Sequence, residues 1–168
     1  MRTLVLGIGN PFLGDDGIGF SIAQELARVV KDENVDVKDA SLPGLNLLEL
    51  IIGYDRVIII DAIMTDDGEV GEIYRLKPEN FVKTVHPASS AHDVNLATAI
   101  EIGKKSLAEQ MPADIIVFAV EIQEVTEFTD EMTRKVKEAI PGVVSLVLEE
   151  IGHSEEYCFS RCGNYSKR

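Results

Sequence analysis

Basic residues, cysteines and long apolar runs are all scarce in this sequence. The 16 lysines and arginines stand against 29 aspartates and glutamates, which gives a formal net charge of −13. A protein that binds nucleic acid neutralises phosphates with a basic face, so this charge argues against that class of partner. Cysteine is limited to Cys158 and Cys162 near the C-terminus, which favours a cytoplasmic protein.

Membrane segments and the common protease signatures are missing as well. No apolar run approaches the roughly 18 residues of a membrane span, and the apolar stretch near the N-terminus is too short for a signal peptide. There is no G-x-S-x-G elbow and no H-E-x-x-H motif, so neither a serine hydrolase of that kind nor a zinc metalloprotease is supported. Two cysteines without neighbouring histidines also fall short of a closed zinc site.

What the sequence does contain is a regular alternation of predicted strands and helices. Strands are expected at 3–8, 35–40, 55–63, 71–77 and 113–120. Helices are expected at 15–31, within 41–53, at 93–107, and at 129–152 with an interruption at Pro141. This order predicts a single-domain three-layer α/β/α fold with a twisted, mostly parallel five-stranded sheet centred on the first and third strands. The domain is expected to span 1–152, with 153–168 as a mobile tail.

The stretch GIGNPFLGDDGIG (7–19) follows the first strand and places two acids in a glycine-rich turn. A dinucleotide-binding turn is the first hypothesis, and Asp39 stands about where a ribose-binding acid would fall. However, Phe12 replaces the third glycine of that fingerprint. Asp15 and Asp16 would also repel a pyrophosphate by roughly 4 kcal/mol per charge pair at an effective dielectric of 20. The sequence therefore argues against a dinucleotide.

Two interpretations remain for the acidic turn. Asp15 could simply cap the following helix, because an acid at a helix N-terminus satisfies unpaired N–H groups. Two adjacent carboxylates, with Gly17 and Gly19 beside them, instead suggest that something large approaches the helix start, and a cation would fit.

Asp61 and His92 are the candidates for completing such a site. Asp61 ends the most apolar strand, and in a parallel sheet that end lies where the winding direction reverses, next to the acidic turn. His92 precedes a predicted helix capped by Asp93, whereas His86 and His153 lack such an anchor. Carboxylates with one imidazole suit borderline divalent metals and leave coordination positions open.

Three segments in consistent order resemble one family. LVLGIGNPFLGDDGIG, VIIIDAI and SSAHDVNLATAI are similar to the maturation endopeptidases of nickel–iron hydrogenases, over about residues 2–150. The resemblance implies an α/β endopeptidase that removes the C-terminal extension of the large-subunit precursor after nickel insertion. The metal would be nickel carried by the substrate, with other divalent ions able to substitute.

The resemblance also assigns roles to residues. Metal contacts would be made by Asp16, Asp61 and His92. Catalytic roles would fall to Asp16, Asp39 and Asp61, with Asp39 or Asp61 as the base that activates water. Substrate contacts would be made by Asn10, Ser41 and Gly44. The loop ASLPG (40–44) departs from the Gly-Thr pair common in the family, which affects which precursor is recognised.

Two other functions remain open on sequence alone. A metal-sensing chaperone of the precursor would need the same aspartates and histidine without proteolysis. A peptidyl-tRNA hydrolase shares an opening strand followed by GxGNPG, but this chain lacks that last glycine, and its charge opposes tRNA binding.

Overall fold

The structure, a computed structural model, describes residues 1–41, 46–80, 91–123 and 128–152. Its strands are β1 (Thr3–Ile8), β2 (Val35–Ala40), β3 (Arg56–Ile63), β4 (Ile73–Leu76) and β5 (Asp114–Glu121). Its α-helices are α1 (Ile18–Val29), α2 (Asn46–Ile51), α4 (Ala91–Ser106) and α5 (Arg134–Glu150). Two short 3-10 helices are η1 (Gly14–Gly17) and η2 (Ala108–Gln110). The expected tail at 153–168, with Cys158, Cys162 and His153, lies outside the described residues, as does His86.

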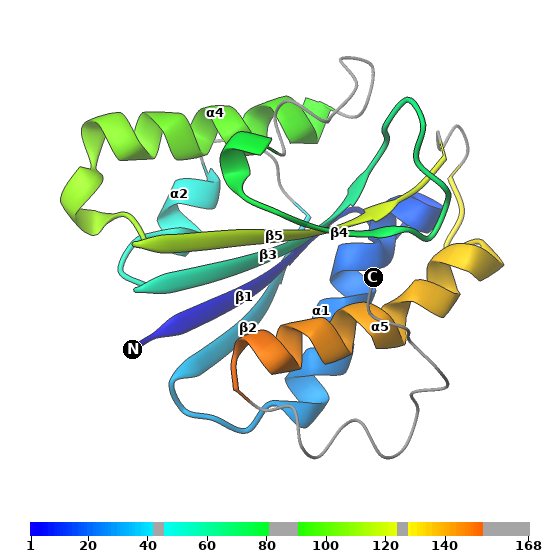
Figure 1. Cartoon of the computed structure of the whole chain (residues 1–168), viewed down its shortest axis with the longest axis horizontal. Coiled ribbons are helices and arrows are strands. Elements are labelled where there is room, and N and C mark those ends of the chain that lie inside the picture. The colour runs from blue at the N-terminus through cyan, green and yellow to red at the C-terminus, as the bar shows by residue number, and fades with distance from the viewer. Residues whose placement is uncertain (42–45, 81–90, 124–127, 153–168) are drawn as a thin grey trace.

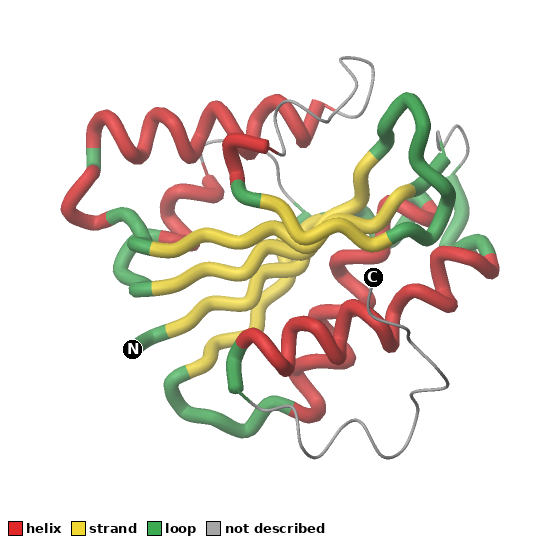
Figure 2. The backbone as a smooth tube through the Cα atoms, in the orientation of Figure 1, coloured by secondary structure: helices red, strands yellow, loops and turns green. Residues whose placement is uncertain are grey.

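The five strands form one sheet in the order β2-β1-β3-β5-β4. All neighbouring strands are parallel except β4, which runs antiparallel to β5. Helices α2 and α4 cover one face and α1 and α5 cover the other (Figure 1), and the backbone trace shows the same three layers (Figure 2). The predicted α/β/α fold with a mostly parallel sheet is confirmed, including the pairing of the first and third strands.

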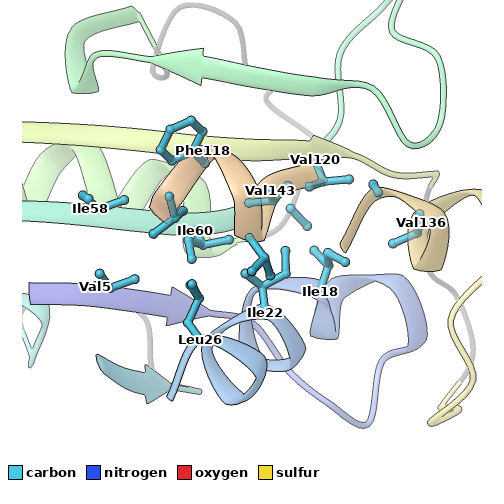
Figure 3. Close-up of a cluster of buried hydrophobic side chains, with 14 of the residues drawn as sticks. Val5, Ile18, Ile22, Leu26, Ile58, Ile60, Phe118, Val120, Val136 and Val143 are labelled. Atoms are coloured by element: carbon cyan, nitrogen blue, oxygen red, sulfur yellow. The ribbon is translucent and has the colours of Figure 1, made fainter. Parts of the chain in front are cut away.

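Alternation along the central strands builds a separate core on each face. In β1, Leu4 and Leu6 belong to the cluster with α2 and α4, whereas Val5 packs with α1 and α5. Figure 3 shows the second of these clusters, where Ile58 of β3 and Phe118 of β5 meet the apolar stripes of α1 and α5. A run of β-branched residues in β3 is therefore buried on both faces, as a central parallel strand requires.

The first and the last predicted helices differ from the observed ones. The helix expected from residue 15 is a 3-10 turn at Gly14–Gly17 followed by α1 from Ile18, so the two aspartates precede the α-helix. The interruption expected at Pro141 is wrong, because α5 runs through that residue. Buried residues on both sides of the proline, Ala139 and Val143 among them, pack against the sheet and keep the two halves of α5 in line. Among the described residues, no helix is long and apolar enough to cross a membrane.

A charged cluster ties the end of α5 to the beginning of the sheet. Arg56 donates to Asp114 at 2.8 Å, to the backbone carbonyl of Glu150 at 2.7 Å, and to the Glu150 carboxylate. Arg75 of β4 donates to the same carboxylate at 3.1 Å. Hydrogen bonds from Arg75 and then Arg56 hold the pKa of Glu150 below its ordinary value, against the opposing effect of burial.

Replacing Ile58 by alanine is expected to destabilise the fold. Ile58 is fully buried in the cluster with α1 and α5, so the truncation leaves a cavity and should cost about 2–5 kcal/mol of unfolding free energy. Urea unfolding followed by circular dichroism measures this loss. An unchanged unfolding midpoint would contradict the position of Ile58 in the core.

Acid should weaken the fold partly through Glu150. Its pKa lies below the ordinary 4.5, so its contribution to stability is complete above that pH and is lost as the pH falls through the lower, folded-state value. The variant Glu150→Gln should therefore show a shallower loss of unfolding free energy below pH 4.5 than the wild type. Glu138→Gln is the matched control, since Glu138 makes only an exposed pair with Arg134 within one helix. Equal slopes for Glu150→Gln and the wild type would argue against this linkage.

Candidate functional site

The carboxyl ends of three parallel strands bring the predicted site segments to one edge of the sheet. Gly7 of β1 is in register with Asp39 of β2 on one side and with Ile60 of β3 on the other. Asp61 follows one residue later and is in register with Ala119 of β5. The glycine-rich turn begins directly after β1, so residues from three distant parts of the sequence meet at this edge.

The turn is closed by hydrogen bonds within itself. The Asn10 side-chain oxygen accepts the Phe12 N–H at 3.0 Å, and the Leu13 N–H donates to the Asn10 carbonyl at 3.0 Å. The Asn10 N–H in turn donates to the Asp16 carboxylate at 2.9 Å. Asn10 and Asp16, both predicted site residues, are therefore held together across the mouth of the turn.

The sequence suggested that Gly17 and Gly19 make room for a cation. In the structure they make room for the protein's own backbone. A Cβ at Gly19 would lie 2.1 Å from the Ile8 carbonyl oxygen and 2.5 Å from that of Ile60. A Cβ at Gly17 would lie 2.9 Å from Pro11 Cα. What approaches these glycines is the protein's own backbone, which lets the helix start sit directly on the ends of β1 and β3.

Asp15 has a structural role different from the helix cap that the sequence allowed. The N-cap of α1 is Gly17, with no side-chain cap hydrogen bond. Asp15 is 5% exposed, and its carboxylate accepts two hydrogen bonds from Thr133, one from the N–H at 2.6 Å and one from the hydroxyl at 2.9 Å. Asp15 thus links the turn to the start of α5, whereas the carboxylate of its neighbour Asp16 accepts the Asn10 N–H within the turn.

Asp61 is buried at the end of β3, with 4% of its surface exposed. One of its carboxylate oxygens accepts the N–H of Ala62 at 2.9 Å. By strand alternation Asp61 shares the sheet face of Ile59 and Ile63, which pack in the cluster with α2 and α4. A carboxylate at this position is directed toward the layer that contains α4.

Helix α4 begins on that face, near the carboxyl ends of the strands (Figure 1). His92 is its second residue, so the backbone carries this histidine to the same end of the sheet as Asp61. Its side chain lies outside the described residues, as does that of Asp93. The helix begins at Ala91, so Asp93 lies in its first turn and not at the cap position that was expected.

Asp39 lies at the same edge but on the other face. Val35 and Val37 of β2 pack with the α1 and α5 cluster. Because side chains alternate along a strand, Asp39 lies on the same face as these two valines, and it is exposed. Ser41 is exposed just after β2, while Gly44 lies outside the described residues. The backbones of Asn10, Asp16 and Asp61 therefore lie at this edge, and Asp39 leaves the sheet on the face opposite to that of Asp61.

Sequence reasoning overlooked one buried acid at this edge. Glu121 ends β5, is 2% exposed, and accepts the Thr65 N–H at 2.7 Å and the Thr65 hydroxyl at 3.1 Å. Like Asp61, it is an acid that ends an apolar strand, which is the signal that could have identified it. Its partners show that it secures the loop after β3.

The described side chains do not by themselves make a metal site. Among those side chains, no group of three or more histidines, cysteines, aspartates or glutamates is arranged to hold a metal ion. A carboxylate has about four acceptor positions, so the single hydrogen bond from Asn10 leaves Asp16 able to contact a further positive group.

Comparisons with known proteins identify the family. Residues 20–150 match the hydrogenase maturation protease family HycI. The hydrogenase 2 maturation protease of Escherichia coli is 33% identical over 101 residues, which cover 60% of this chain and 62% of that protein. The solved structure of the hydrogenase maturating endopeptidase HybD from E. coli matches with a TM-score of 0.80 and 28% identity, over 92% of this chain and 94% of that chain. The hydrogenase maturation protease HycI from Thermococcus kodakarensis KOD1 matches with a TM-score of 0.70 and 27% identity, over 90% and 92% of the two chains.

These matches favour the protease interpretation over the peptidyl-tRNA hydrolase alternative. The family match spans well over half of the chain, and the same fold recurs in solved members. The chain belongs to the hydrogenase maturation protease family and is a hydrolase of that family.

Proposed function

We propose that this protein is an endopeptidase that removes the C-terminal extension of a nickel–iron hydrogenase large-subunit precursor, and that it recognises nickel bound by that precursor. Family membership supports the processing of a hydrogenase precursor. The observation that supports the proposal is the backbone arrangement: the turn that carries Asp16, the end of β3 with Asp61, and the start of α4 lie at the same end of the sheet.

The carboxylate and imidazole groups at this edge explain why a metal ion bound to the substrate would be recognised there. Carboxylate oxygen and imidazole nitrogen are ligands for borderline divalent ions such as nickel. An ion that arrives with ligands from the precursor needs only a few further contacts, which Asp16, Asp61 and His92 would provide. Those contacts would anchor the precursor's tail and hold one peptide bond in place for hydrolysis.

The hydrolysis itself requires a base for the attacking water. The base takes a proton from the water molecule while the water oxygen bonds to the peptide carbonyl carbon. The departing amine is then protonated as the C–N bond breaks. Asp39 and Asp61 are the candidates. Their strands are separated by β1, so their backbones are about 10 Å apart, and the carboxylates leave the sheet on opposite faces. One water would therefore be activated by one of them and not by both together.

The variants Asp16→Asn, Asp61→Asn and His92→Ala should each abolish processing of nickel-loaded precursor while the protein remains folded. Each change removes a metal contact at a strand or helix end and leaves the two apolar clusters intact. Mass spectrometry of the large subunit measures processing, and thermal unfolding reports the fold. Asp67→Asn, which alters an exposed acid in the loop after β3, is the control and should process normally.

The same experiment separates the alternatives. Loss of cleavage in Asp39→Asn, with binding of the nickel-loaded precursor retained, would assign the base to Asp39. Processing at the wild-type rate by all three metal-contact variants would remove this edge of the sheet from consideration. Wild-type protein that binds the loaded precursor but leaves its mass unchanged would point to a chaperone without proteolysis.

Nickel-free precursor should remain uncut by the wild-type protein. Without the ion, the tail loses the anchor that positions its peptide bond. The test compares precursor before and after nickel loading, with the same enzyme preparation and the same mass measurement. Efficient cleavage of the nickel-free form would refute metal recognition while leaving the protease activity itself intact.

A further inference from the structure

Two phenylalanines stand out on the surface beside the candidate site. Phe12 is 68% exposed and Phe128 is 86% exposed, whereas Phe118 is buried in the core with 1% exposed. A single exposed apolar residue is ordinary, whereas contiguous exposed apolar surface is a feature of interaction sites.

Backbone pairing makes these two residues neighbours. Leu13 and Thr129 form a parallel bridge, in which the Thr129 N–H donates to the Phe12 carbonyl at 3.0 Å and the Gly14 N–H donates to the Thr129 carbonyl at 2.6 Å. Phe12 and Phe128 each precede the bridged residue by one position. The hydrogen bond from the Thr129 N–H to the Phe12 carbonyl brings these two positions to adjacent places, about 5 Å apart across the pair. The two exposed phenylalanines are therefore neighbours along the paired backbones, and we refer to them as the aromatic pair.

The backbone segments that carry the aromatic pair, Phe12 and Phe128, are connected to each other by several hydrogen bonds. Thr133 donates twice to the buried Asp15 carboxylate, at 2.6 and 2.9 Å, which fixes the second segment to the glycine-rich turn. Gly14 has a φ of +52°, and a Cβ there would lie 3.1 Å from the Glu131 carbonyl oxygen. Exposed side chains on a preorganised backbone lose little backbone entropy on binding a partner.

The pair is also continuous with the candidate site. The Phe12 N–H donates to the Asn10 side chain, and the Asn10 N–H donates to Asp16. A protein segment held on the aromatic pair would thus lie beside the acid that we propose contacts the substrate's metal.

We infer that the aromatic pair is a docking surface for the protein substrate, which presents an apolar side chain flanked by basic residues. This inference rests on the proposed function and adds a contact remote from the metal. Asp130 and Glu131 are exposed two and three residues after Phe128, and the nearby Arg134 donates to Glu138 at 2.7 Å, so the charge around the pair favours a basic segment. A second copy of this chain would bring another net charge of −13 to the same surface, which opposes self-association there.

The test measures docking apart from metal recognition. Binding of nickel-free large-subunit precursor to the full chain is followed by isothermal titration calorimetry. Phe12→Ala and Phe128→Ala should each raise Kd by at least about tenfold, as truncation of an aromatic hot spot does. Phe128→Trp, which keeps a large aromatic surface, should hold Kd within about threefold of wild type. All variants should melt within about 1 °C of wild type, because the rings are exposed.

Ile102→Ala is the matched control, since Ile102 is 40% exposed on α4 away from this pair, and it should leave Kd unchanged. Unchanged Kd in both phenylalanine variants would overturn the inference, as would a wild-type protein that does not bind nickel-free precursor. A dimer by sedimentation that dissociates in Phe12→Ala would overturn it in favour of self-association. Failure of the wild type to process nickel-loaded precursor would instead count against the proposed function, because the binding measurement does not depend on cleavage.

Discussion

The close contact between Gly7 of β1 and Gly19 of α1 is the constraint on which the rest of the site depends. A Cβ at Gly7 would lie 2.1 Å from the Gly19 carbonyl oxygen, and a Cβ at Gly19 would lie equally close to the Ile8 carbonyl oxygen. Only residues without side chains allow a helix to sit this close to a strand. The turn between them is therefore short and pressed against the sheet edge, which is what holds Asp16 beside the ends of the strands.

The two adjacent aspartates in that turn have different hydrogen-bond partners. Asp15 is directed inward and accepts both hydrogen bonds from Thr133, so it joins two segments that are 118 residues apart. Asp16 is directed toward Asn10 and the edge of the sheet. Asp15 thus joins the turn to α5, and Asp16 closes the turn on itself through Asn10. The same link to Thr133 also positions the segment that carries Phe128, so metal recognition and substrate docking would share one rigid base.

Much of the framework was predictable because its signals are local. The buried strands were read from short β-branched and apolar runs, and β1 and β2 have the predicted bounds. The position of Asp61 at the carboxyl end of the central strand followed from the rule that parallel strands end at a common edge. The interruption predicted at Pro141 was wrong, because the burial of α5 on both sides of the proline outweighs the low helix propensity of that residue. The prediction that a cation approaches Gly17 and Gly19 was wrong, because a glycine in the sequence indicates that space is needed but does not indicate which atoms occupy it.

The sequence by itself determined the α/β class, the order of the elements and the acids at the strand ends, because periodicity and turn residues act over a few positions. Tertiary structure alone decided which acid faces which partner. It turned Asp15 toward Thr133, placed Asp39 and Asp61 on opposite faces of the sheet, and set Phe12 next to Phe128. These outcomes depend on contacts between segments far apart in the chain, and such contacts leave no periodic pattern in the sequence.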